Sequence, residues 1–180
     1  MLTQLRQIAI RLPDPFKGSA ALASLLIGLS VSSFSQPLQV EGHAFVQAGI
    51  GLYDVRRKSV SPMKQVELHF PTSFTGVQSI AGFAGSETDD SYLYAGLLHE
   101  FVLLKPILVS VSFSAGLYTR GTGIELGSPL EFRSAARAAW LWSSGFSLGI
   151  EIAHLSHAHL VESNPGLETL TILYAFPVRM

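Results

Sequence analysis

Residues 107–119, ILVSVSFSAGLYT, alternate between apolar side chains and small or polar ones, and this stretch decides the fold class. Successive side chains of a β-strand point to opposite faces, so Val109, Val111 and Phe113 would share one face and Ser110 would lie on the other. A tilted strand of about 9–11 residues is enough to cross a bilayer. The stretch therefore predicts a membrane-spanning strand.

The same two-residue period recurs along the chain between turn signals, although it is weak in residues 77–84 and 92–103. Alternating segments of about ten residues are typical of transmembrane barrels. The expected strands cover residues 40–52, 64–70, 77–84, 92–103, 107–119, 130–142, 146–156 and 167–176. Together they predict an all-β fold, an eight-stranded antiparallel transmembrane β-barrel of the outer-membrane type.

Composition supports a chain that places much of its surface in lipid. Charged residues make up 14% of the 180 residues and apolar residues 48%, whereas soluble domains carry about 25% charged residues. The net charge of −1 gives no basic field for nucleic acid. The absence of cysteine excludes disulfides, thiolate metal sites and thiol nucleophiles.

The N-terminal residues 1–35 are typical of a cleaved secretory signal peptide, which leaves residues 36–180 as the barrel domain. Arg6, Arg11 and Lys17 precede an apolar run that ends near residue 31, and small residues follow up to Ser35. The run is shorter than the roughly 20 residues of a spanning helix. An uncleaved anchor helix is the alternative.

Connector lengths orient the expected barrel. Short connectors at 71–76, 105–106 and 143–145 alternate with generally longer ones at 53–62, 85–91, 120–129 and 157–166. Outer-membrane barrels have short periplasmic turns and longer extracellular loops. The strand end that carries His154 and Ser156 should therefore lie at the outer rim.

His154, Ser156 and Glu168 form the candidate catalytic set. His154 and Ser156 are two residues apart and share the face of Ile150 and Ile152, the expected lipid face. Glu168 opens the next strand on its apolar face, and antiparallel pairing would return it beside them. Serine needs a base, and the base needs an orienting group. Ser156 would be the nucleophile, His154 the base and Glu168 the orienter; the alternative is a polar interfacial band without catalysis.

A metal site is a further alternative, because His154, His157, His159 and Glu162 are close in sequence. Strand parity opposes it, since His157 and His159 would share one face while His154 takes the other. The charged side chains of residues 131–151 are expected to pair inside the barrel.

At these residues the chain resembles the lipid A 3-O-deacylase (PagL) family of Gram-negative outer membranes. The resemblance covers roughly the last third of the chain and rests on His154-x-Ser156, Asn164-x-Gly166-x-Glu168 and the closing aromatic strand. It implies a serine esterase that removes the 3-O-linked acyl chain from lipid A. The base would be His154, the nucleophile Ser156 and the orienter Glu168. The resemblance implies no metal or organic cofactor, lipopolysaccharide of the outer leaflet as substrate and, as a possibility, a homodimer.

The chain departs from the family at His157 and His159, where the family commonly has asparagine and glycine. Loss of an oxyanion donor costs about 10²–10³ in rate. His157 or backbone N–H groups would have to donate instead, and Asn164 and Gly166 keep the loop that returns Glu168 to the site.

Two other classes of function stay open on the sequence. One is a non-catalytic or inactivated barrel with a structural or adhesion role, which would not require three such residues on one face. A small pore is disfavoured, because eight strands leave little lumen and Tyr118, Arg133 and Arg137 are expected inside it.

Overall fold

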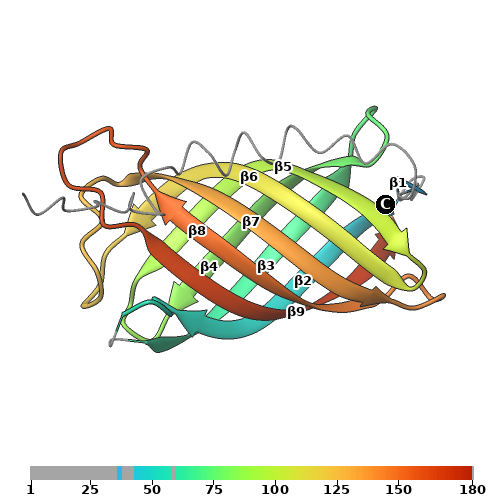
Figure 1. The fold of residues 1–180 in the computed structure, drawn as a ribbon, viewed down its shortest axis with the longest axis horizontal. Helices are drawn as coiled ribbons and strands as arrows, with labels where there is room; N and C mark the ends of the chain where they lie inside the picture. The colour runs from blue at the N-terminus through green and yellow to red at the C-terminus, as the bar shows by residue number, and fades with distance from the viewer. Residues whose placement is uncertain (1–35, 38–42, 58–59, 180) are drawn as a thin grey trace, which may run out of the picture. The chain divides into compact units, whose positions relative to one another are not determined.

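The computed structural model describes residues 36–37, 43–57 and 60–179, which form antiparallel β-strands joined by loops (Figure 1). The expected signal peptide, residues 1–35, lies outside the described residues. Within the described part no helix is long and apolar enough to cross a membrane. The strands are β1 Gln36–Pro37, β2 His43–Tyr53, β3 Ser61–Pro71, β4 Val77–Ser86, β5 Ser91–Leu104, β6 Ile107–Thr119, β7 Leu130–Leu141, β8 Ser147–Ser156 and β9 Leu167–Arg179.

Strands β2 to β9 close into an eight-stranded antiparallel barrel, as the sequence predicted. Each strand pairs with the next in sequence, and β9 returns to β2 over the register from His43↔Arg179 to Tyr53↔Thr169. The two-residue β1 adds a short pairing with β5. The pairing with β2 also explains why β9 runs on to Arg179, beyond the predicted strand end at residue 176.

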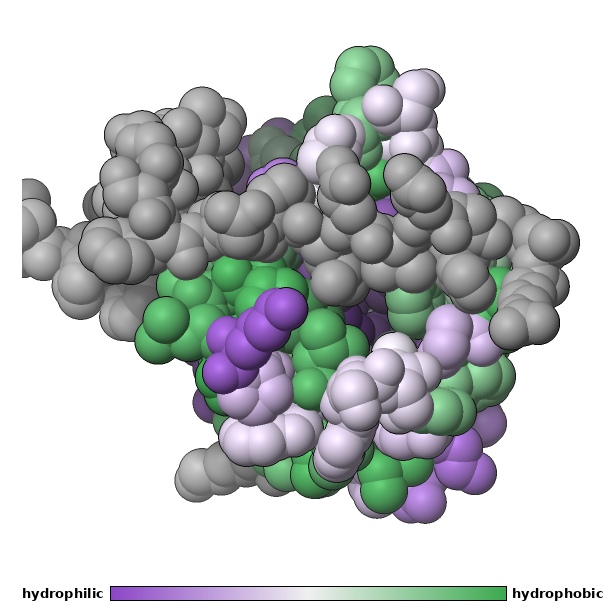
Figure 2. Space-filling model, turned by 90° about the vertical axis from the view of Figure 1, so that its right-hand side faces the viewer, coloured by the Kyte–Doolittle hydropathy of each residue, from purple (hydrophilic) through white to green (hydrophobic). Residues whose placement is uncertain are grey.

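The outer wall of the barrel carries many exposed large apolar side chains. Ile150 is 55% exposed, Ile152 60% and Ile172 54%. Figure 2 looks onto the end with the short turns, and hydrophobic residues occupy much of the flank around it. Exposure of this extent is unusual on a soluble monomer and suits contact with lipid.

The barrel interior holds charged side chains in pairs. Arg133 hydrogen bonds to Glu151, and Arg137 Nη2 donates to Glu100 Oε1 at 2.5 Å. The paired interior predicted from the sequence is thus confirmed for Arg133 and Glu151, whereas Arg137 finds its partner on β5. Glu131 has no hydrogen-bond partner for its carboxylate among the described residues.

Aromatic side chains fill the barrel toward the long-loop end. The hydroxyls of Tyr53 and Tyr118 lie 2.9 Å apart, and Tyr94 Oη donates to Glu67 Oε2 at 2.8 Å. The Arg133 guanidinium stacks over the Tyr94 ring at 5.0 Å. Tyr118 and Arg133 occupy the interior as predicted, so the described lumen is packed with side chains.

The loops gather at the two ends of the barrel. Residues 54–60, 87–90, 120–129 and 157–166 connect the strands at one end, on the left in Figure 1, and residues 72–76, 105–106 and 142–146 turn at the other. The predicted grouping of the connectors at two ends is therefore confirmed. The connector 87–90 is shorter than predicted, because β4 continues to Ser86, which pairs with Met63 of β3.

Breaking the Arg133–Glu151 pair should destabilise the barrel. Glu151→Ala leaves a guanidinium inside the barrel without its carboxylate, at an expected cost of about 3 kcal/mol. Urea titration in detergent micelles, followed by heat-dependent gel mobility, measures the loss. Glu125→Ala is the matched control, because Glu125 pairs with Arg120 on the surface and is 63% exposed; such a pair contributes about 0–1 kcal/mol. Equal effects of the two substitutions would contradict the prediction.

Candidate active site

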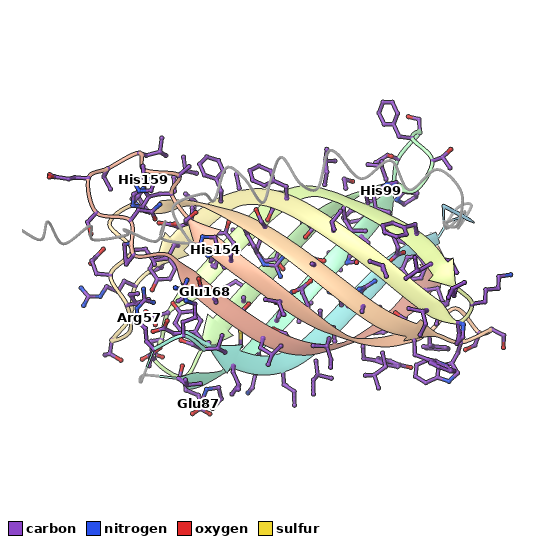
Figure 3. The ribbon with its side chains drawn as sticks, in the orientation of Figure 1. Arg57, Glu87, His99, His154, His159 and Glu168 are labelled. Carbon is purple, nitrogen blue, oxygen red and sulfur yellow. The ribbon has the colours of Figure 1, made fainter. Side chains whose placement is uncertain are left out.

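The β8–β9 hairpin places His154 directly opposite Glu168. His154 Nδ1 lies 3.1 Å from Glu168 Oε1, within hydrogen-bonding distance. The His154 side chain is 39% exposed and that of Glu168 15%. Figure 3 shows both residues at the long-loop end of the barrel, on adjacent strands. Antiparallel register therefore produces the imidazole–carboxylate contact that strand parity predicted.

Ser156 is the last residue of β8 and follows His154 on the same face of the strand. That face also carries the exposed Ile150 and Ile152, and Ser156 itself is partly exposed beside Phe132 of β7. The Ser156 hydroxyl makes no hydrogen bond with any other described residue. The three predicted residues thus share the outer face at one end of the barrel, with His154 and Glu168 in contact and Ser156 next to them.

Arg56 joins this group, and the sequence analysis missed it. The loop 54–60 follows β2, which pairs with β9, and Val55 N donates to the Glu168 carbonyl oxygen at 3.1 Å. Arg56 Nη1 donates to Glu168 Oε1 at 2.7 Å. The same carboxylate oxygen therefore faces both the guanidinium of Arg56 and the imidazole of His154, and two groups fix its orientation.

Arg57 fastens the loop 157–166 to the loop 54–60. Its Nη1 donates to Oδ1 of the buried Asp54 at 2.6 Å, while its Nη2 donates to the carbonyl oxygens of Pro165 at 2.8 Å and Gly166 at 3.0 Å. The sequence indicates this contact only indirectly. Closure of the predicted barrel would bring these two loops together, although they are about 100 positions apart.

Gly166 brings the backbone of the loop 157–166 close to the imidazole ring of His154. Its φ is +62°, in the left-handed region, and a Cβ placed on it would lie 2.8 Å from His154 Cε1. Both the backbone angle and the contact therefore require glycine. Gly166 was predicted to support the site through the loop, and in the structure its backbone packs against the imidazole ring of His154.

His157 and His159 do not share a face, because β8 ends at Ser156 and the parity of a strand no longer applies. His157 is fully buried, and its Nε2 donates to the Ser163 carbonyl oxygen at 2.7 Å. His159 is exposed in a turn closed by Leu160 N and the His157 carbonyl oxygen, with its Nδ1 3.5 Å from Asn164 Nδ2. In Figure 3 His159 lies in the loop beyond His154.

The described residues contain no group of three or more metal-ligating side chains. What the outer face does bring together is a hydroxyl, an imidazole and a carboxylate. Such a set suits nucleophilic attack, in which the imidazole accepts the hydroxyl proton and the carboxylate orients the imidazole.

The family comparison matches the segment that contains this site. Residues 103–177 match the model described as lipid A 3-O-deacylase (PagL). Lipid A deacylase PagL of Pseudomonas aeruginosa is 30% identical over 76 residues, which make up 42% of this chain and 44% of that protein. The aligned segment therefore spans less than half of the curated relative.

Solved structures show the same fold over most of the chain. The crystal structure of the outer-membrane enzyme PagL has a TM-score of 0.63 and 21% identity, covering 74% of this chain and 99% of that one. A de novo designed transmembrane β-barrel has a TM-score of 0.58 and 14% identity, with coverages of 78% and 98%. Neisserial surface protein A has a TM-score of 0.53 and 8% identity, with coverages of 81% and 99%.

Gly166→Ala should disturb the His154–Glu168 contact. The added Cβ strains a left-handed backbone, at about 1–2 kcal/mol, and pushes against the imidazole ring. We expect the ring resonances of His154 to shift in nitrogen–proton NMR spectra of the protein in micelles. Gly145→Ala is the control, since Gly145 also has a positive φ of 85° but lies in the turn between β7 and β8. Unchanged His154 resonances in Gly166→Ala would show that the loop does not hold the ring.

Proposed function

We propose that this chain, whose resemblance to the lipid A 3-O-deacylase (PagL) family is confirmed by the match over residues 103–177, is an esterase of the Gram-negative outer membrane. Its reaction would remove the 3-O-linked acyl chain from lipid A in the outer leaflet. The observation that carries the proposal is the contact of His154 with Glu168 on the outer face that also bears Ser156.

The proposed reaction has two steps. Ser156 Oγ attacks the ester carbonyl carbon while His154 Nε2 takes the hydroxyl proton, and a tetrahedral oxyanion forms. The C–O bond to the sugar breaks, His154 returns the proton to the leaving 3-hydroxyl, and the acyl chain stays on Ser156. Water, activated by His154, then hydrolyses this acyl-enzyme and releases the fatty acid. Catalytic hydrogen bonds are often loose without substrate, which is compatible with the unbonded Ser156 hydroxyl.

Glu168 would hold the imidazole with its proton on Nδ1, so that Nε2 faces the serine. The contact between Nδ1 and Oε1 supports this tautomer. Arg56 would serve as a positioning residue, because it donates to the same carboxylate oxygen and fixes its direction.

Asn164 is the side chain we propose as the oxyanion donor. His157 is buried and bonded to Ser163, so its ring is engaged elsewhere. Asn164 carries an amide two residues before Gly166, which packs against His154, and its one side-chain hydrogen bond to another described residue is the long one to His159. Backbone N–H groups just after Ser156 would complete the oxyanion site.

A furrow along β7 offers a place for the acyl chain. The outward residues Ser134, Ala136 and Ala138 are small, and Ser134 lies directly opposite His154. At Ala138 this row of small residues meets a groove of about 440 Å³, which Trp140 and Ile150 also line. An acyl chain lying there would place its ester near Ser156 without leaving the membrane. One chain supplies all of these residues, so a homodimer is not required.

Mass spectrometry of lipid A after incubation of purified protein with lipopolysaccharide tests the proposed function. We expect the wild type to remove one hydroxyacyl group, Ser156→Ala to lose at least about 10³-fold in rate, and Glu168→Gln to lose on the order of 10⁴-fold. Ser143→Ala, the same substitution in the turn at the other end, should keep full activity. An unchanged lipid A mass with folded wild-type protein would favour the non-catalytic barrel instead.

Filling the furrow should change which acyl chains are released. Ala138→Leu adds bulk to the lining of the groove, so we expect longer acyl chains to lose rate relative to shorter ones, by about 10-fold for a few excluded methylenes. Competition between lipid A species with different 3-O-acyl lengths measures the ratio. Ala95→Leu on the outer face of β5 is the control, and an equal ratio in both variants would argue against the furrow.

A further inference from the structure

Two ionisable side chains are buried on neighbouring segments at the long-loop end of the barrel, and the proposed reaction uses neither. His157 and Glu131 are both fully buried. His157 Nδ1 and both carboxylate oxygens of Glu131 lack hydrogen-bond partners among the described residues. Phe132 of β7 pairs with Ser156 of β8, and Glu131 and His157 are the adjoining residues on these two neighbouring segments. Buried polar groups without partners are rare, so this pair needs an explanation.

The other edge of the His157 ring has a clear partner. Nε2 donates to the Ser163 carbonyl oxygen at 2.7 Å, which ties the beginning of the loop 157–166 to its later part. Gly127 of the neighbouring loop lies close to this contact, because a Cβ on it would lie 2.8 Å from the Ser163 carbonyl oxygen and 3.5 Å from His157 Nε2. A carbonyl oxygen only accepts, so Nε2 must carry a proton.

Glu131 completes the arrangement from the interior. An isolated buried carboxylate is costly, as is an unpartnered ring nitrogen. Both costs fall if a water molecule bridges Glu131 and His157 Nδ1, so that the two groups share one proton through it. Whichever of the two holds that proton, Nε2 keeps its own and the bond to Ser163 persists.

The segment 163–166 is therefore held from two sides. His157 binds the Ser163 carbonyl oxygen from within the barrel, and Arg57 binds the carbonyl oxygens of Pro165 and Gly166 from the loop 54–60. Gly166 lies against His154 at the end of this segment. Movement of the segment would release the imidazole ring from one of its neighbours.

We propose that His157, backed by Glu131, is a positioning residue that anchors the loop 157–166 from inside the barrel and so holds Gly166 against His154. The effect on turnover rests on the proposed esterase function, whereas the anchoring does not. In this arrangement His157 acts through the loop and does not touch the substrate.

Substitutions at position 157 that differ in side-chain length test whether this residue anchors the loop or donates to the oxyanion. The amide of His157→Gln extends about as far as Nε2 and can donate to Ser163, whereas that of His157→Asn is one methylene shorter, and His157→Leu has no donor. Hydrogen exchange of the amides in residues 158–166, measured in micelles, reports the anchor without any substrate. We expect exchange about tenfold faster in His157→Leu and His157→Asn, and near wild type in His157→Gln.

Turnover of lipopolysaccharide then tests the link to the site. We expect kcat to fall about tenfold in the Leu and Asn variants with KM little changed, and to recover in the Gln variant. Glu131→Leu should also speed the exchange, and Glu131→Gln should not. His99→Leu, at the opposite end of the barrel in Figure 3, controls for loss of a histidine as such.

Two results would overturn the proposal. Unchanged exchange in a folded His157→Leu variant would show that the loop is held without the histidine. Recovery of turnover by Asn but not by Gln would make position 157 an oxyanion donor. If the wild-type protein releases no acyl chain but exchange is still faster in His157→Leu, the anchoring role of His157 stands and only the proposed esterase function is contradicted.

Discussion

The pairing of β9 with β2, which closes the barrel, is the contact on which the rest of the structure depends. It leaves no free strand edge between β2 and β9, so the strands alternate between an inner and an outer face, apart from a register shift between Val102 and Leu104 of β5. It also sets the loop 54–60 beside the loop 157–166. Arg56 and Arg57 reach Glu168, Pro165 and Gly166 only because the first and last barrel strands are neighbours.

The sequence was most informative where a single physical rule acts. Strand parity predicted the eight strands, the inner position of Arg133 and the pairing of His154 with Glu168, because each follows from a two-residue period and an antiparallel turn. Strand ends were less accurate, as in β4 and β9, since they depend on how far a neighbouring strand continues. The roles of His154, Ser156 and Glu168 stay a proposal that the geometry supports.

The rest could not be read from the sequence because it depends on loop conformation. The inward position of His157 follows strand parity, because it lies two residues after the inward Leu155, but its bond to Ser163 depends on the turn with positive φ at Ala158 and His159. The contacts of Arg57 depend on two loops that are distant in sequence. Neither the bond of His157 to Ser163 nor the contacts of Arg57 leave a periodic signal in the sequence.

The three proposed catalytic residues lie within one hairpin, from His154 to Glu168, although Arg56 and Arg57 support them from the loop 54–60, and the paired charges that fill the barrel come mostly from other strands. The residues proposed for catalysis and the residues that stabilise the barrel are thus largely different parts of the chain. A lineage of such barrels can acquire, alter or lose a reaction by changing about fifteen consecutive positions, and the remaining wall keeps its shape. A shared barrel is for that reason a poor guide to shared activity, and this single hairpin is the segment to compare among relatives.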